Sequence, residues 1–127
     1  MINMTKEKSV LLFIVVFILF SGVADVLSAD TTKEAEKIEL LIARLEAMQD
    51  TVFIRNGKEY SSNRAAEHLR LKWIKAGKRV HTAEDFIELC GSRSSISGKA
   101  YQIRFADGRL EDSAVILKEL LNEIEKQ

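Results

Sequence analysis

An unbroken run of 11 apolar residues, Val10–Phe20, divides the 127-residue chain into a leader and a folding part. A short charged segment precedes the run, and the small residues Gly22 and Ala24 follow it. A secretory signal peptide typically has a positively charged start, a short apolar run, and small residues three positions and one position before the cleavage site. We therefore predict a signal peptide over residues 1–29, with cleavage after Ala24 or Ala29.

An uncleaved anchor in the inner membrane, formed by residues 10–24, is the alternative. A membrane-spanning helix needs about 20 apolar residues, and here the shorter apolar run is followed by Ser21, Gly22 and soon Asp25. We therefore expect an exported protein in which residues 30–127 form a single domain. Contact with a membrane is expected only through the N-terminal segment, if that segment stays uncleaved.

The exported part contains a single cysteine, Cys90, so no internal disulfide can stabilise it. Stability must then come from a hydrophobic core, which a domain of about 100 residues can build. The spacing of Cys90 from Phe86 and Ile87 indicates a small, buried apolar residue. An intermolecular disulfide through Cys90 is the alternative.

Apolar residues at helical spacing predict four helices. We expect Thr31 and Ser113 to cap the first and last helix, and Gly77 and Gly91 to end the middle two in the left-handed conformation. The segments are approximately 31–50, 61–77, 82–91 and 113–124.

Two turn signals predict a small sheet between these helices. Asn56-Gly57 favours a type I′ hairpin, because both residues tolerate a positive φ. Residues 100–105 alternate between apolar and polar side chains, as a half-buried strand does, and Asp107-Gly108 is a second turn signal. The expected fold class is therefore α+β: a small single domain of four helices, with an antiparallel sheet built from hairpins.

Charge is segregated along the chain, although its net charge is zero. Residues 51–106 carry 11 basic against 5 acidic side chains, and each flank is acidic. Within this segment, His68, Lys72, Lys75 and Arg79 form a basic stripe at helical spacing. Such a stripe is typical either of a solvated face packed beside a core or of a surface for an anionic lipid or polymer. Export and zero net charge argue against binding of nucleic acid.

The segment GSRSSISGKAY, residues 91–101, invites comparison with a phosphate-binding loop. Gly91 and Gly98 are separated by six residues instead of four, and Ala100 stands where the motif has Ser or Thr. The segment also joins a helix to a strand, the reverse of the order that the motif needs. His68, His81 and Cys90 match no standard metal-ligand spacing, so we expect neither a cofactor nor a metal ion.

A small serine/histidine hydrolase is the remaining catalytic hypothesis. Ser95 or Ser97 would be the nucleophile and His68 the general base. The segment has no G-x-S-x-G elbow, however, and its serines can instead bond to backbone groups at the helix end. The sequence therefore favours a protein that is not an enzyme.

The motifs FIRNG, AAEHLRLK and TAEDFIELCGSRSSISGKAY, with the signal-like start, resemble the YfeK-like family of exported bacterial proteins, a domain of unknown function. The resemblance covers approximately residues 38–124 and implies a periplasmic, single-domain protein without an assigned activity. It directs attention to polar residues of the motifs as ligand-binding candidates: Arg55, His68, Lys72, Ser92, Ser95, Ser97 and Tyr101.

The leading hypothesis is a non-enzymatic binding module in the periplasm. It would bind a partner protein or an anionic envelope component through the basic stripe and the serine-rich segment. The alternatives are the hydrolase and a purely structural or stress-related envelope protein.

Overall fold

The computed structural model describes residues 29–127. The signal peptide predicted for residues 1–29 lies outside the described residues, apart from Ala29. Chain contacts define two units, Met1–Lys33 and Glu34–Gln127, and the second contains the sheet and the core.

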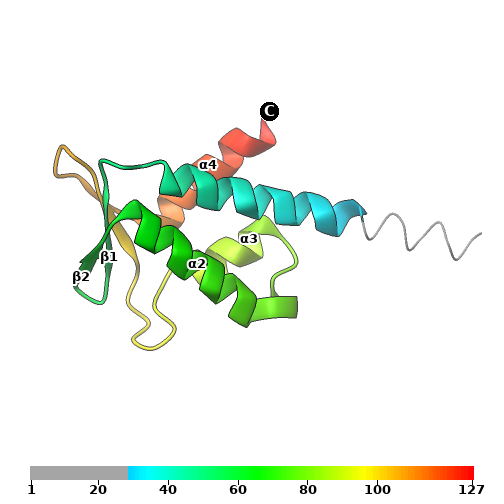
Figure 1. Cartoon of the computed structure of the whole chain (residues 1–127), viewed down its shortest axis with the longest axis horizontal. Helices are drawn as coiled ribbons and strands as arrows, with labels where there is room; N and C mark the ends of the chain where they lie inside the picture. The colour runs from blue at the N-terminus through cyan, green and yellow to red at the C-terminus, as the bar shows by residue number, and fades with distance from the viewer. Residues whose placement is uncertain (1–28) are drawn as a thin grey trace, which may run out of the picture. The chain divides into compact units, whose positions relative to one another are not determined.

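The second unit is an α+β domain, which confirms the predicted fold class. A helix that is continuous over 29–46 leads into β1 (Val52–Arg55) and β2 (Lys58–Tyr60). The remaining elements are α2 (Ser62–Ala76), η1 (Gly77–Arg79), α3 (Ala83–Phe86), η2 (Ile87–Gly91), β3 (Gln102–Arg104), β4 (Leu110–Asp112) and α4 (Ser113–Glu125). The four strands form one antiparallel sheet in the order β2-β1-β3-β4, with the helices beside it (Figure 1).

Both outer strands of the sheet belong to hairpins, as the turn signals predict. Asn56 (φ 50°) and Gly57 (φ 75°) both have positive φ, the conformation that a type I′ turn requires. Gly108 (φ 87°) lies in the turn between β3 and β4. The central pair of strands then aligns Phe53 of β1 with Ile103 of β3.

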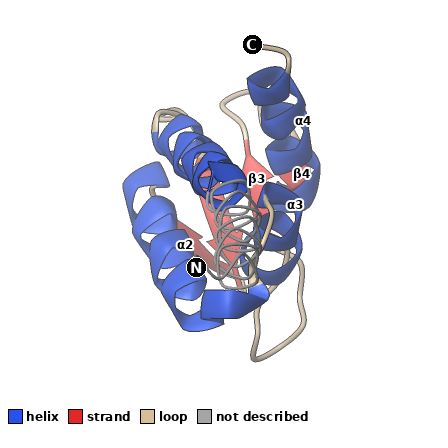
Figure 2. Cartoon of the chain, turned by 90° about the vertical axis from the view of Figure 1, so that its right-hand side faces the viewer, coloured by secondary structure: helices blue, strands red, loops and turns tan. Residues whose placement is uncertain are grey.

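The core lies between one face of this sheet and the helices, with α2 and α4 on either side of it in Figure 2. Phe53 and Ile103 supply its sheet side. The helices supply most of its fully buried side chains, which include Leu41, Ile42, Leu45, Phe86, Ile87, Cys90 and Leu117. Cys90 is a free thiol with no exposed surface, so the prediction of a buried cysteine is confirmed.

Several helix ends differ from the predictions. Gly77 does end α2 with a positive φ of 52°, but Gly91 is not left-handed and closes the π-helical turn η2. Glycine at position 91 allows close packing, because a Cβ there would lie 2.5 Å from Leu117 Cδ1 and the buried Leu117 side chain would have to shift. Thr31 does not begin its helix, which already includes residues 29 and 30. Ser113 does not cap α4 either: Asp112 is the N-cap, and the Ser113 hydroxyl donates to the Gly91 carbonyl.

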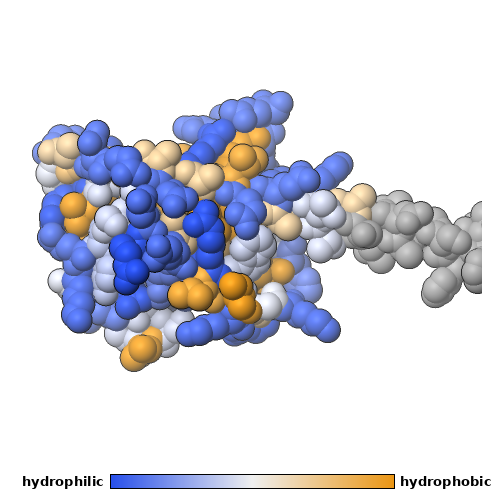
Figure 3. Space-filling view, in the orientation of Figure 1, coloured by the Kyte–Doolittle hydropathy of each residue, from blue (hydrophilic) through white to orange (hydrophobic). Residues whose placement is uncertain are grey.

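The surface over α2 combines charged and apolar side chains. In Figure 3 apolar residues gather over this helix, among hydrophilic ones. Leu71 and Ile74 are 57% and 75% exposed, and Ile96 in the loop after η2 is 96% exposed. Single exposed apolar residues need no special account, but Leu71 lies beside a pocket described below.

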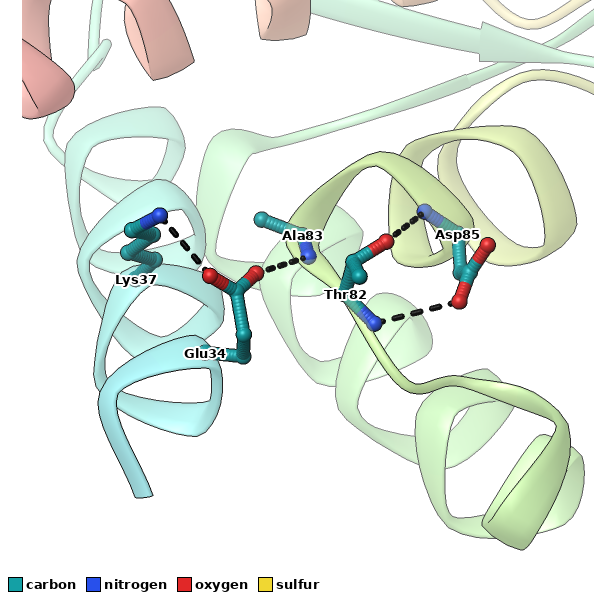
Figure 4. Close-up of polar contacts among 5 residues, drawn as sticks. All are labelled: Glu34, Lys37, Thr82, Ala83 and Asp85. Carbon is teal, nitrogen blue, oxygen red and sulfur yellow. Dashed lines mark hydrogen bonds and ion pairs between the residues drawn. The ribbon is translucent and has the colours of Figure 1, made fainter. Parts of the chain in front are cut away.

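Five residues form a closed polar group that fixes the start of α3 and is called here the capping cluster: Glu34, Lys37, Thr82, Ala83 and Asp85 (Figure 4). Thr82 and Asp85 form the predicted capping box, with both hydrogen bonds at 3.1 Å. Ala83 N–H donates to Glu34 Oε2 at 2.8 Å, and Lys37 Nζ pairs with Glu34 Oε1 at 2.8 Å. Each hydrogen-bonding group drawn in this cluster therefore has a partner from the protein itself.

Candidate functional site

Strand alternation places Arg55 on the inner face of the sheet. Side chains of a strand point alternately to its two faces, so residues two apart share a face. Phe53 is buried in the core, and Arg55, two residues later at the end of β1, therefore extends from the same face. By the same reasoning, Tyr101 shares a face with the buried Ile103 of the neighbouring strand, which is two residues later. Tyr101 is itself only 8% exposed.

Helix α2 brings two further polar side chains to this place. His68 and Lys72 are four residues apart, so they lie one above the other on one face of the helix. The ring of His68 is half-buried, and so is Lys72. Arg55, His68, Lys72 and Tyr101 meet here, and together they are called the cationic cluster.

Contacts within the cationic cluster are short. Arg55 Nη1 lies 2.8 Å from both ring nitrogens of His68, and the Tyr101 hydroxyl lies 3.3 Å from His68 Nε2. Lys72 Nζ donates to the Tyr101 hydroxyl at 3.0 Å and to the Arg93 carbonyl at 2.9 Å. Arg55 also lies over the ring of Tyr60, with 5.2 Å from Cζ to the ring centroid. Elements distant in sequence therefore meet at one point.

The environment of His68 keeps its ring neutral. Burial and, after it, the nearby positive charges of Arg55, Lys72 and Lys75 together lower the pKa of His68 to about 4. A neutral ring leaves a lone pair on one nitrogen, which can accept a hydrogen bond from Arg55. His68 therefore acts near neutral pH as an uncharged hydrogen-bonding group between two cations.

The two cations of the cluster lack acidic partners. Within residues 29–127, five other basic side chains form ion pairs with Asp or Glu, whereas Arg55 and Lys72 form none. Concentrated positive charge without a carboxylate is the electrostatic arrangement that attracts an anion. An arginine beside a lysine also supplies the donors that carboxylate and phosphate groups accept.

The cationic cluster forms part of the wall of a pocket of about 180 Å³. Arg55, His68 and Tyr101 all line this pocket, together with apolar residues of α2, β1 and α4. No sequence signal predicted the pocket, because it results from the way in which the sheet and three helices pack together.

The structure does not bring the serine candidates to His68. Ser92 Oγ donates to the Ile87 carbonyl at the end of η2, and Ser97 Oγ donates to Asn56 Oδ1 in the first hairpin turn. Ser95 is exposed and makes no side-chain hydrogen bond within the described part of the chain. Of the seven predicted candidates, Arg55, His68, Lys72 and Tyr101 meet in the cationic cluster, and the three serines lie in the loop.

Ser94 and Asn56 organise this loop, and neither was among the predicted site residues. Ser94 is 5% exposed, and its Oγ accepts hydrogen bonds from Asn56 Nδ2 at 3.2 Å and from the backbone N–H of Ile96 and Ser97 at 3.3 Å. A Ser that bonds to backbone N–H groups two and three residues later is a recognised turn signal. The partner Asn56 could not be found this way, because the contact is not local.

This geometry gives the hydrolase hypothesis no support. The hydrogen-bonding partners of His68 within residues 29–127 are Arg55 and Tyr101, and neither is a serine. An imidazole with a pKa of about 4 is also a weak general base near neutral pH. Over the same residues there is no group of three His, Cys, Asp or Glu side chains able to hold a metal ion, and no helix is long and apolar enough to cross a bilayer.

Comparison with known proteins places the chain in a family. Residues 32–125 match a family of unknown function, DUF5329, and the chain belongs to this family. It is also similar to the uncharacterized protein YfeK of Salmonella typhimurium strain LT2, with 40% identity over 68 residues. That match covers 54% of this chain and 57% of the relative, so it spans just over half the length of each. No solved structure matches significantly. The resemblance predicted from the motifs is confirmed, and it carries no assigned activity.

Proposed function

We propose that this protein is a non-enzymatic binding module that recognises an anionic component of the bacterial envelope at the cationic cluster. The observation that carries the proposal is the pair of cations, Arg55 and Lys72, that contact the linked His68 and Tyr101 side chains and have no carboxylate partner within residues 29–127. A carboxylate or phosphate group of the ligand would accept hydrogen bonds from both side chains and complete the cluster.

A titration followed by NMR tests this proposal. Acetate or inorganic phosphate is added to isotope-labelled protein purified from cells that express the full chain. We expect saturable shifts in the signals of Arg55, His68, Lys72 and Tyr101. Arg55→Gln and Lys72→Gln should each weaken binding about tenfold, which corresponds to the loss of one charged hydrogen bond.

Lys78→Gln is the matched control, because Lys78 is exposed and lies in η1, outside the cationic cluster. This variant should bind acetate and phosphate as the unmodified protein does. If the control loses as much affinity as Lys72→Gln, binding is a general effect of positive charge and the proposed site is wrong. The same conclusion follows if no signal of the cluster responds to either anion.

Export to the periplasm is part of the same proposal, and the N-terminal sequence pattern supports it. The mature protein recovered from the periplasmic fraction should begin at Asp25 or Asp30, which intact mass and N-terminal sequencing can determine. A chain of full mass in the membrane fraction would instead favour the anchor over residues 10–24.

A further inference from the structure

The pocket beside the cationic cluster is mainly apolar away from that cluster. Its volume is about 180 Å³, and its wall comes from α2, the sheet, α4 and the helix that ends at residue 46. The apolar lining residues include Leu45, Phe53, Ala65, Leu69, Leu71 and Leu117. Leu71 is exposed and the others are largely buried, so the pocket leads from the surface of α2 towards the core.

Part of the polar lining of the pocket comes from the cationic cluster. Arg55, His68 and Tyr101 belong both to the pocket wall and to the cationic cluster. If this cluster binds the anionic group of a ligand, the rest of that ligand would therefore lie next to the apolar part of the wall. Binding sites for small molecules commonly combine an apolar lining with a few convergent polar groups in this way.

The charge of the pocket wall also favours an anion. Glu67 is the one acidic residue that lines it, and Glu67 already pairs with Arg64 at 3.0 Å. Both members of that pair are well exposed, with 58% and 70% of their side chains accessible. The charge of Arg55 is thus left without compensation in the pocket wall.

The pocket volume sets the size of the apolar group. A cavity of about 150 Å³ accommodates a benzene-sized molecule, so one of about 180 Å³ takes a six-membered ring or a chain of about six carbons. Pockets for drug-sized ligands begin at about 300 Å³. The available space therefore does not hold a nucleotide or a complete long acyl chain.

We infer that the ligand is a small amphipathic anion: a single carboxylate or phosphate group bound by the cationic cluster, attached to an apolar group of about six carbons that enters the pocket. This inference rests on the proposed function and adds the chemical class of the ligand to it.

A series of probes that differ in one property at a time separates the two levels of the proposal. Acetate has little more than the head group. Hexanoate carries a five-carbon chain on a carboxylate, and hexyl phosphate carries a six-carbon chain on a phosphate. Hexyltrimethylammonium has the six-carbon chain with the opposite charge. We expect hexanoate or hexyl phosphate to bind at least about tenfold more tightly than acetate, because each buried methylene strengthens binding about three- to fourfold. The tighter of the two identifies the head group, and hexyltrimethylammonium should not bind.

Two variants test whether the chain occupies the pocket. Ala65→Leu fills part of it and should remove the advantage of hexanoate while acetate still binds, whereas Ala43→Leu, at an exposed helical position, should change neither. Leu71→Gln alters the exposed mouth with little risk to folding and should weaken hexanoate binding severalfold. Ile74→Gln is its control, because Ile74 is exposed on the same helix and does not line the pocket.

Each outcome decides between the proposals. If acetate and hexanoate bind equally at the cationic cluster, the inference about the apolar group is wrong and the proposed function stands. If no anion binds, or if hexyltrimethylammonium binds as well as hexanoate, the proposed function fails and the inference fails with it. Loss of the hexanoate advantage in Ala65→Leu but not in Ala43→Leu supports both.

Discussion

The capping cluster and the cationic cluster both contain charged side chains from different elements of the fold, but they differ in how their charges are satisfied. In the capping cluster, Glu34 accepts hydrogen bonds from Lys37 and from the Ala83 backbone, so opposite charges and dipoles face one another. In the cationic cluster, Arg55 and Lys72 face a neutral His68, and within residues 29–127 no carboxylate pairs with either. Under the proposed function, the first cluster serves stability and the second serves binding.

The pKa values express the same difference. Burial alone would raise the pKa of Glu34, but the hydrogen bonds from Lys37 and Ala83 outweigh it and lower the pKa. In Asp85, the hydrogen bonds from the backbone of His81 and Thr82 lower the pKa, with burial opposing them. For His68, burial and neighbouring cations act in the same direction and disfavour the charged form. The fold thus stabilises the charges of the capping cluster and opposes any further positive charge in the cationic cluster.

Removal of Glu34 should have the largest effect on stability. Glu34→Ala deletes the ion pair with Lys37 and leaves the N–H of the buried residue Ala83 without its partner. We expect a loss of about 2 kcal/mol in the free energy of unfolding, measured by urea denaturation. Glu36→Ala, which removes an exposed carboxylate of the same helix, should change stability by less than about 0.5 kcal/mol. Equal losses in the two variants would mean that the capping cluster has no special structural role.

Acidification should destabilise the domain through His68 before it affects the capping cluster. The pKa of His68 is about 4 in the folded protein and 6.5 in the unfolded chain, so the unfolded chain takes up a proton first as the pH falls. Stability is therefore lost between pH 6.5 and pH 4. Glu34 and Asp85 have lowered pKa values in the folded protein, from ordinary values of 4.5 and 3.8. Their contribution to stability is therefore lost only as the pH falls below these ordinary values and the carboxylates become protonated.

Because the ring of His68 is only half-buried, solvent screens part of this effect, and we expect a loss of about 1–2 kcal/mol. Urea denaturation at about pH 7 and about pH 5 measures it, and His68→Gln should remove most of the difference. A pH dependence that survives this substitution would assign the effect to other groups.

Loss of the Thr82 hydroxyl should have an intermediate effect. Thr82→Ala removes the side-chain acceptor for Asp85 N–H at the start of α3, and loss of such a cap costs about 1 kcal/mol. Thr82→Ser keeps the hydroxyl and should retain most of the stability in thermal unfolding. If alanine and serine at position 82 are equally stable, the hydrogen bond is not what stabilises this helix end.

Removal of charge from the cationic cluster should have the smallest effect on stability. Lys72→Gln keeps a polar side chain and removes a cation that disfavours protonation of His68. We expect the free energy of unfolding to change by less than about 0.5 kcal/mol, while the pKa of His68 rises. A loss comparable to that of Glu34→Ala would show that Lys72 is structural, and the contrast between the two clusters would disappear.

The fold could be predicted where local signals are strong. The positive φ values of Asn56 and Gly57 follow from the residue types, because glycine has no Cβ and asparagine tolerates this conformation. The capping box of Thr82 follows from its spacing to Asp85. Gly91 differs from its prediction, because a glycine after a helical stretch usually ends the helix in the left-handed conformation. Its actual role depends on contact with Leu117 in α4, which is not a local property of the sequence.

The site could be predicted only in part for the same reason. Helical spacing brings His68 and Lys72 together, and alternation from the buried Phe53 could have placed Arg55 on the inner face of the sheet. That these residues meet Tyr101 depends on the pairing of β1 with β3 and on the packing of α2. Among the serine candidates, Ser92 donates to Ile87 and Ser97 donates to Asn56, contacts that the sequence does not predict. Ser95 is exposed, and its role stays a prediction.

The pKa of His68, measured by NMR with and without saturating hexanoate, tests most directly whether the cationic cluster binds an anion. Without ligand we expect a pKa of about 4, because burial and nearby cations disfavour the charged ring. With hexanoate we expect the pKa to rise, since a bound negative charge beside His68 favours its protonated form, while the ring signals of exposed His81 do not respond. A pKa of His68 that stays the same in saturating hexanoate would contradict the account.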